Sequence, residues 1–332
     1  DHLGYYSLQH DFPCLQVHKV YARKNAIWPF TVVGRPPQED TSFGALIHEI
    51  TGDAIQQEIP GLKEVHAVDA AGVHPLLLAI GSERYTPYAI TKRPAELLTI
   101  ANHMLGSGQL SLAKYAFITA DETHQLSTHT IHDYLHFIFE RIDLENDLHF
   151  YTKTSIDTLD YSGDGLNTGS KLVLAAYGEK RRNLAIEMPS CFHHLQLFSK
   201  PYLCIPGVIA LQCNEAFDNQ TTEQQLAILD EQLKTKLEDL NGILQIILCD
   251  DSAFVAKSLA NYLWVTYTRS NPANDVFGIA SFTLYKHWGC KGPMIIDARI
   301  KPHHAPILEK DPAVEKRVDR FFQKGGVLEK WG

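Results

Sequence analysis

Four histidines within a short stretch are the residues whose spacing could most readily bind a metal ion. They are His124, His129, His132 and His136. The last three share one helical stripe at positions i, i+3 and i+7, and a zinc site of this kind needs two such histidines and a carboxylate. Asp133 and Glu140 are nearby, but Asp133 lies off the stripe and the HExxH pattern is absent. The pattern favours a partly exposed helix face, with a His-rich metal-binding α/β protein as the alternative.

A second combination, Cys191 with His193 and His194, could bind a soft metal. No second pair of ligands follows at zinc-finger spacing, so no metal site is predicted there either. Motifs for other chemistries are also missing from the sequence. No strand is followed by a P-loop or by GxGxxG, and no GxSxG elbow is present. Motifs alone therefore predict neither a metal centre nor a nucleotide-binding loop nor a serine hydrolase.

The charge balance and the cysteines exclude several classes of protein. Lys and Arg number 30 and Asp and Glu 39, which gives a formal net charge of −9. Such a chain is not attracted to nucleic acid or to an anionic membrane, and its apolar runs fall short of the roughly 18 residues of a membrane helix. The six cysteines form no CxxC pair, which is typical of reduced thiols. We therefore expect a cytoplasmic protein of about two domains.

The order of apolar runs and turn residues is typical of an α/β protein. An N-terminal β-rich piece comes first, with strands predicted at 15–23 and 26–33. A helix then begins near Thr41 or Ser42 and ends at Pro60-Gly61. Two similar series of elements follow. In the first, strands are predicted at 64–70, 74–82, 114–120, 147–151 and 171–177, and helices after Pro94 and Ser127. In the second, strands are predicted at 202–211, 242–248, 275–280 and 293–299, and helices at 221–240, 252–267 and 312–323.

The two series also share residues at a nearly constant offset. ITAD at 118–121 matches ILCD at 247–250, an offset of 129. Tyr134-Leu135 matches Tyr262-Leu263, and the run from Arg141 to Asp147 matches the run from Arg269 to Asp275, both at 128. A constant offset through strand, helix and loop indicates an internal duplication. We therefore predict two packed α/β units, with a boundary near 179–200.

Several longer strings resemble the UbiD family, the 3-polyprenyl-4-hydroxybenzoate decarboxylases and their relatives. The first is Asp1-His2-Leu3-Gly4-Tyr5-Tyr6, followed by Phe12-Pro13 and by VHKVYARKNAIWPFTVVGRPPQED at 17–40. ITADE at 118–122, the Arg269–Asp275 run and KGPMIIDAR at 291–299 resemble further family signatures. The segment YTPYAITKRP at 85–94 departs from the family pattern.

The resemblance implies a fold class of α/β, with tandem duplicated α/β units following the last strands of a split β-barrel flavin-binding domain. The chain would then divide into residues 1–40, the last barrel strands, 41–190, a UbiD-like C-terminal unit, and 191–332, a second unit with a terminal helix. It would be the C-terminal portion of a longer protein, because it begins at Asp1 within a family motif and not at Met.

The resemblance also implies non-oxidative decarboxylation of an aromatic or α,β-unsaturated acid with prenylated FMN and a divalent metal, in ubiquinone or menaquinone biosynthesis. Asp1 matches the family's proton donor. The family's arginine, its first acid, its metal ligands and most of its flavin surface precede this motif, so we expect the chain alone to be inactive and to bind no cofactor. Expected partners are the small acid, further copies of the chain and, for a lipid-like substrate, a membrane surface. A non-catalytic oligomerisation or lid module is the second hypothesis.

Overall fold

A computed structural model describes residues 3–9, 11–28, 33–85, 88–90 and 92–331. Its first part contains a five-stranded mixed sheet. The strands are β1 (Leu62–Ala67), β2 (Leu76–Gly81), β3 (Tyr115–Ala120), β4 (Leu148–Thr154) and β5 (Gly169–Ala176). Their order is β1-β2-β3-β5-β4, with β2, β3 and β5 parallel and both edge strands antiparallel. The three central strands are buried along their whole length, as expected for parallel strands covered on both faces.

A second sheet repeats this topology. Its strands are β6 (Phe198–Ile205), β7 (Val208–Cys213), β8 (Gln245–Cys249), β9 (Val276–Gly278) and β12 (Met294–Asp297). Their order is β6-β7-β8-β12-β9, again with three parallel strands between two antiparallel edge strands. A separate hairpin, β10 (Ser281–Leu284) and β11 (His287–Cys290), joins β9 to β12. The prediction of a mixed α/β fold is therefore confirmed.

Helices connect the strands in both parts. The α-helices are α1 (Glu39–Glu58), α2 (Glu96–Leu105), α3 (Ile131–Arg141), α4 (Thr222–Leu233), α5 (Ser252–Ala256), α6 (Leu259–Thr268), α7 (Pro272–Asp275) and α8 (Pro312–Phe322). Short 3-10 turns are η1 (Asp69–Ala71), η2 (Gly108–Leu112), η3 (Ser190–His194) and η4 (Glu329–Trp331). The helix predicted at 252–267 is divided into α5 and α6, because Ser258 caps α6 by accepting the N–H of Asn261. The helix predicted at 221–240 ends at Leu233.

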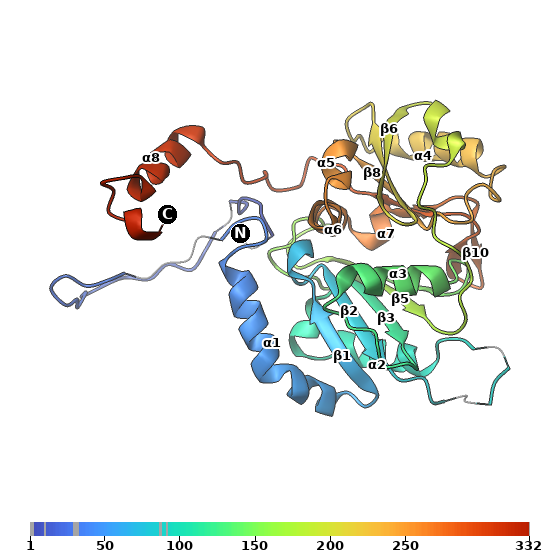
Figure 1. Cartoon of the computed structure of the whole chain (residues 1–332), viewed down its shortest axis with the longest axis horizontal. Helices are drawn as coiled ribbons and strands as arrows, with labels where there is room; N and C mark the ends of the chain where they lie inside the picture. The colour runs from blue at the N-terminus through green and yellow to red at the C-terminus, as the bar shows by residue number, and fades with distance from the viewer. Residues whose placement is uncertain (1–2, 10, 29–32, 86–87, 91, 332) are drawn as a thin grey trace.

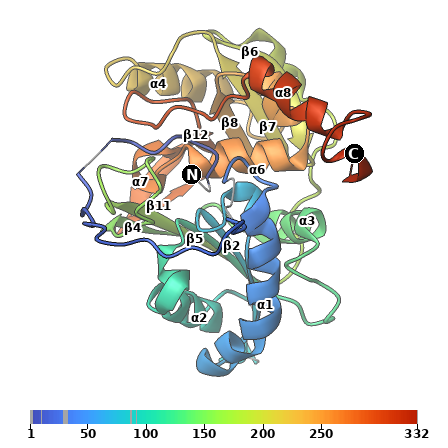
Figure 2. The same cartoon turned by 90° about the vertical axis from the view of Figure 1, so that its left-hand side faces the viewer.

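One hydrophobic core joins the two sheets. It contains side chains of β2 and β3 from the first sheet, of β7 and β8 from the second, and of α3 and α6 between them. Figures 1 and 2 show these two helices lying between the sheets. The rings of Phe117 and Tyr267 meet edge to face, with centroids 6.0 Å apart, and Tyr115 Oη lies 2.8 Å from Ser270 Oγ. Two smaller cores lie on the outer faces, under α2 and under α4. The units therefore share their largest apolar interior.

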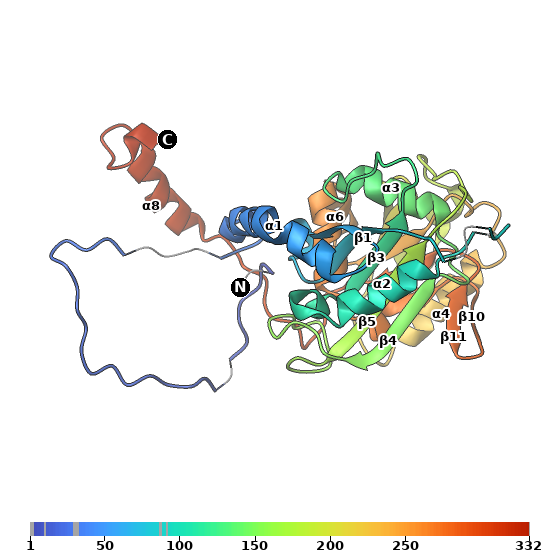
Figure 3. The same ribbon diagram turned by 90° about the horizontal axis from the view of Figure 1, so that it is seen from below.

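The N-terminal strand prediction is wrong for the residues that the structure describes. Residues 15–23 and 26–28 form no strand, and 29–32 lie outside the described residues. Leu15 and Ile27 are each more than 90% exposed. The residues are rich in strand formers, but a strand also needs a neighbour for its backbone hydrogen bonds, and none lies beside them in the described part of the chain. Figure 3 shows this segment and α8 extending away from the two sheets.

None of the described helices is both long enough and apolar enough to span a membrane.

Candidate functional site

The predicted proton donor Asp1 lies outside the described residues, so its position is not tested. The description begins at Leu3, and the next residues differ sharply from the exposed segment that follows them. Leu3 and Tyr5 are buried, at 2% and 6% exposure. The Gly-Tyr pair of the family-like motif therefore sits in a defined position on the body of the protein.

Backbone hydrogen bonds hold the motif on both sides. The indole N–H of Trp264, in α6, donates to the carbonyl oxygen of Leu3 at 2.8 Å. The N–H of Tyr6 donates to the carbonyl of Pro306 at 2.8 Å, and the N–H of Leu308 donates to the carbonyl of Gly4 at 3.2 Å. The motif thus runs between α6 and the segment that follows β12.

The side chain of Tyr5 adds an aromatic and a polar anchor. Its ring stacks on Trp264 with centroids 5.3 Å apart. Its hydroxyl lies 2.7 Å from Thr268 Oγ1 and accepts a bond from Arg269 Nε at 3.2 Å. Burial raises the pKa of Tyr5 above its ordinary value, although the charge of Arg269 opposes the rise. Tyr5 is therefore a neutral phenol whose ring and hydroxyl group both have partners.

Gly4 is the motif residue with a strict conformational requirement. Its φ is +88°, and a Cβ at this position would lie 2.9 Å from the Cα of Arg35 and 3.1 Å from Trp264 Nε1. The guanidinium of Arg35 lies over the rings of Trp264 and Phe254, 4.3 and 4.8 Å from their centroids, and it also donates to Asn261. The Gly-Tyr and GRPP motifs, which are about 30 residues apart in sequence, therefore meet on α6.

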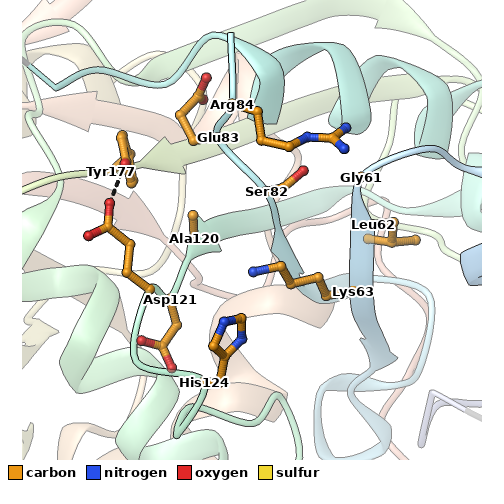
Figure 4. A pocket seen from close by; sticks show the side chains of 11 residues that line it. Gly61, Leu62, Lys63, Ser82, Glu83, Arg84, Ala120, Asp121, His124 and Tyr177 are labelled. Carbon is orange, nitrogen blue, oxygen red and sulfur yellow. Dashed lines mark hydrogen bonds between the residues drawn. The ribbon is translucent and has the colours of Figure 1, made fainter. Parts of the chain in front are cut away.

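A hollow of about 510 Å³ lies elsewhere, at the carboxyl ends of β2, β3 and β5. Ligands of open α/β sheets commonly bind at this edge. Figure 4 shows Lys63, Arg84, Asp121, His124 and Tyr177 around it.

The carboxylates around this hollow are occupied by structural contacts. Glu83 accepts the N–H groups of Ala95, Glu96 and Leu97 at the start of α2. Glu122 accepts bonds from Lys92 at 2.8 Å and from Tyr177 at 2.5 Å. These residues therefore stabilise the loops at the ends of the strands.

Asp121 follows β3 directly and has four donors around it. Burial would raise the pKa of Asp121, but hydrogen bonds from Leu126, Thr123 and Gln125 outweigh it and lower the pKa to about 2. An acid of such low pKa is a carboxylate at neutral pH and is unsuited to donate a proton. The acidic strand end of the family-like ITADE string is thus a turn-forming element in this structure.

The histidines of the candidate metal site do not converge. Within the described residues, no three His, Cys, Asp or Glu side chains are grouped so that they could hold a metal ion. His129 stacks on His66 with centroids 4.4 Å apart, and His136 lies 3.8 Å from Glu140. His132 lies 3.5 Å from Asp133, and His124 lines the hollow of Figure 4. Each histidine has surroundings of its own.

Cys191, His193 and His194 lie on η3, in a hollow with Lys236 and Asp239. Burial raises the pKa of the Cys191 thiol. A thiol of raised pKa is less readily deprotonated, and metals bind the deprotonated form.

Two features of the junction between the units were missed by the sequence reasoning. Lys114 and Asp160, both almost fully buried, form an ion pair at 2.7 Å. Trp264, Thr268 and Arg269 hold Tyr5, although only Arg269 belonged to a family-like run. The sequence did offer one signal for this pair, because Lys114 is a charged residue next to a buried strand. Its partner Asp160 is 46 residues away, and no spacing rule connects the two.

Two family models match the chain. The Rift-related domain of 3-octaprenyl-4-hydroxybenzoate carboxy-lyase (UbiD) matches residues 1–36, and the C-terminal domain of that enzyme matches residues 41–176. Together they cover just over half of the chain. The first model includes the Gly-Tyr motif and the first three residues of GRPP, and the second covers the first sheet.

Relatives extend the similarity over the second sheet. A Chlamydia pneumoniae protein, named as one of the subunits of 4-hydroxybenzoate decarboxylase, is 35% identical over 322 residues, which are 96% of this chain and 50% of that protein. An uncharacterized protein of Chlamydia caviae is 33% identical over 328 residues, 98% of this chain and 52% of that protein. The chain therefore spans about half the length of the curated relatives it matches.

Among solved structures, the vanillic acid decarboxylase of Sedimentibacter hydroxybenzoicus in an open form is 14% identical. The match covers 48% of this chain and 33% of that one, with a TM-score of 0.37. A likeness at this level carries no argument about function.

The topology defines an α/β protein of two similar sheets, on which an N-terminal motif segment is seated. With the two family models matched, the chain belongs to the UbiD family of carboxy-lyases, as the sequence strings predicted.

Proposed function

We propose that this chain is the C-terminal part of a prenylated-FMN-dependent enzyme that decarboxylates an aromatic or α,β-unsaturated acid without net oxidation. Membership of the family supports the reaction class. The observation that carries the proposal is that hydrogen bonding and stacking hold the Leu3–Tyr5 segment against Trp264. A proton donor next to this segment in sequence needs such a defined position.

In the proposed reaction, this chain supplies only the proton. Breaking the bond to the carboxylate leaves an electron pair on carbon, and prenylated FMN, when bound, supplies the acceptor for that pair. The carbon must then receive a proton. We assign this step to the carboxylic acid of Asp1, which would give its proton to the carbon that lost CO2.

The described residues do not fit a metal site of their own. They hold no group of three acidic, histidine or cysteine side chains suited to a metal. The proposal therefore assigns prenylated FMN and its divalent metal to parts of the whole protein outside this chain, and it expects the chain alone to be inactive. It further assigns residues 1–40 to the last strands of a split β-barrel that those parts complete.

The two-sheet topology supports the remaining division at 41–190 and 191–332. The first sheet ends at Ala176 and the second begins at Phe198. The same order and directions in both sheets are what a tandem duplication would leave. We also propose a cytoplasmic location and a role in quinone biosynthesis.

The test uses the whole protein, loaded with prenylated FMN, and 4-hydroxybenzoate as the first probe acid. We expect Asp1→Asn to lower CO2 release by roughly 10²- to 10⁴-fold, the range for loss of a general acid. Asp11→Asn is the matched control, because Asp11 is exposed in the same segment. Full activity of Asp1→Asn would contradict the assignment, and turnover by the 332-residue chain alone would contradict its predicted inactivity.

A second candidate role is assembly, and exposed apolar side chains favour it. On α8, Val314, Val318 and Phe321 lie along one face at i, i+4 and i+7, and each is at least 40% exposed. We propose that this face packs on a second copy of the chain. Sedimentation equilibrium should then give a dimer or larger species, and Val318→Glu should shift it toward monomer. A monomer at all concentrations would rule this role out.

A further inference from the structure

We infer that the second α/β unit positions the acid-bearing segment, with Trp264, Thr268 and Arg269 as positioning residues. This inference rests on the proposed function, because it gives that acid a role in proton transfer. It adds a task for the second unit, which the family model of the C-terminal domain does not cover.

The contacts that fix the segment come almost entirely from the second unit. Trp264 binds the backbone at Leu3 and stacks on Tyr5. Thr268 and Arg269, at the end of α6, hold the Tyr5 hydroxyl. From the first unit, Gly72 leaves room for the side chain of Leu3, since a Cβ at Gly72 would lie 2.3 Å from Leu3 Cδ2. The first unit therefore supplies space for Leu3 and one hydrogen bond at the margin, between Ser7 Oγ and Tyr161 Oη at 3.2 Å. The second unit supplies the hydrogen bonds to residues 3–6.

The duplication provides an internal comparison at the offset of 128. The positions that correspond to Trp264, Thr268 and Arg269 in the first unit are His136, Glu140 and Arg141. Glu140 pairs with Lys180, and the guanidinium of Arg141 lies 3.6 Å from the ring centroid of Phe137 and donates to the Phe137 carbonyl. The same helix positions in the first unit therefore serve local contacts.

The end of α6 is itself held rigidly, which a positioning element requires. Lys301 Nζ donates to the carbonyl of Arg269 at 3.1 Å, and Arg269 Nη1 lies 3.4 Å from Asp250 Oδ2. Thr268 Oγ1 donates to the carbonyl of Trp264 at 2.5 Å. Arg269 is 6% exposed and Thr268 5%. Buried, satisfied polar networks of this kind fix one arrangement.

Such rigidity matters for a proton donor. Proton transfer needs the acid within hydrogen-bond reach of the carbon, and a shift of about 1 Å can cost roughly 10²-fold in rate. Weakening the contacts of Trp264, Thr268 and Arg269 with the segment should therefore lower kcat much more than it changes KM.

The first arm of the test measures how firmly residues 3–8 are held on the second unit, without any cofactor. In the 332-residue chain, hydrogen–deuterium exchange is followed at the amides of residues 3–8. We expect Arg269→Ala and Trp264→Phe to raise exchange there by about 10-fold or more, since each removes a hydrogen bond that closes the segment. Arg269→Lys should recover part of the protection. The matched controls Arg141→Ala and His136→Phe should leave residues 3–8 unchanged.

The second arm measures kcat, KM and the pH profile in the loaded whole protein. We expect Arg269→Ala to lower kcat by about 10-fold or more, with KM changed less than about twofold and with a shifted limb of the kcat profile. Arg269→Lys should restore part of kcat.

The outcomes separate the two ideas. Raised exchange with unchanged kcat and pH profile overturns the positioning role, because the contacts are then only structural. Unchanged exchange in both second-unit variants overturns it as well. If the wild-type protein decarboxylates no acid, the proposed function fails. The exchange arm then still decides whether the second unit holds the segment.

Discussion

The carboxylate of Asp147 accepts a hydrogen bond from the backbone N–H of Asp143 at 2.8 Å. At an offset of 128 residues, Asp275 accepts the same bond from the N–H of Asn271 at 2.7 Å. Each contact closes the turn between a helix of the shared core and an edge strand. Burial raises the pKa of Asp147 to about 7 and that of Asp275 to about 6. The two units therefore share a buried, titrating carboxyl as well as a topology.

The raised pKa of Asp147 predicts a pH-dependent stability. The folded-state pKa of about 7 exceeds the ordinary value of 3.8, so folded protein binds the proton more tightly and loses stability as pH rises through that interval. Asp147→Asn keeps an oxygen acceptor and removes the ionisation. Relative to wild type, its free energy of unfolding should rise between about pH 4 and pH 8 by roughly 3–4 kcal/mol, given about 1.4 kcal/mol per pKa unit over the rise from 3.8 to about 7.

Urea unfolding at about pH 4.5, 6 and 8 measures this difference across the interval in which the carboxyl titrates. Asp133→Asn is the control, because its side chain is 75% exposed. A difference between Asp147→Asn and wild type that stays constant across the three pH values would show that the carboxyl does not titrate in this interval.

The sequence predicted this correspondence between units because local residues determine it. Tyr134 and Tyr262 mark the same turn of α3 and α6, and the polar run after each helix closes a turn within five residues. Strands β2, β3 and β8 were predicted for a similar reason, since each is a short apolar run. The single strand predicted at 202–211 is wrong, because the chain turns back between Ile205 and Val208 and forms the antiparallel pair β6 and β7. Patterns within one element, or within one turn, are visible in a single sequence.

The buried pair of Lys114 and Asp160 provides the second prediction. Both side chains are at most 2% exposed, and they lie 2.7 Å apart, with Ser162 Oγ accepting a further bond from Lys114 at 2.6 Å. Lys114→Met should lower the free energy of unfolding by about 3–5 kcal/mol, because it leaves a buried carboxylate without its partner.

Lys92→Met is the control for this pair, since Lys92 and Glu122 form an ion pair at 2.8 Å with both side chains well exposed. Its cost should be about 1 kcal/mol or less. Chemical denaturation of both variants decides the point. Equal losses would mean that burial does not set the strength of these pairs.

The third prediction concerns the tyrosines that correspond in α3 and α6. The buried hydroxyl of Tyr134 lies 2.8 Å from the carbonyl oxygens of Ala79 and Phe117, on neighbouring strands. The hydroxyl of Tyr262 donates to Gln245 Oε1 at 2.6 Å. Each Tyr→Phe change should cost about 1–2 kcal/mol, because it removes a buried hydrogen bond.

Thermal and urea unfolding of Tyr134→Phe, Tyr262→Phe and the double variant would check this. The two costs should add to within about 0.5 kcal/mol, since the residues share no hydrogen-bond partner. Tyr151→Phe, at a 39% exposed position, should change little. A double variant much less stable than the sum would indicate coupling through the shared core.

The residues that contact the N-terminal motif could not be predicted from the sequence in the same way. Tyr5 and Thr268 are 263 residues apart, and no periodicity links them. The strand prediction at 15–23 was wrong for a related reason. The run from Leu15 to Arg23 has the composition of a strand, but pairing depends on a neighbour that composition does not reveal. Long-range partners therefore limit what the sequence can predict, both for the site and for the fold.

The fourth prediction tests the conformation of the motif itself. At Gly4, a φ of +88° disfavours any L side chain, and an added Cβ would lie 2.9 Å from the backbone of Arg35. Gly4→Ala should therefore displace the segment from Trp264 and expose Tyr5. Chymotrypsin cleaves after aromatic residues. The rate of cutting after Tyr5 should rise by about 10-fold or more if the free energy that holds the segment on Trp264 falls by roughly 1.4 kcal/mol or more.

Gly34→Ala is the control, because a Cβ there would meet nothing within 4 Å. Equal cutting of the two variants would mean that the left-handed backbone at Gly4 is not what seats the motif.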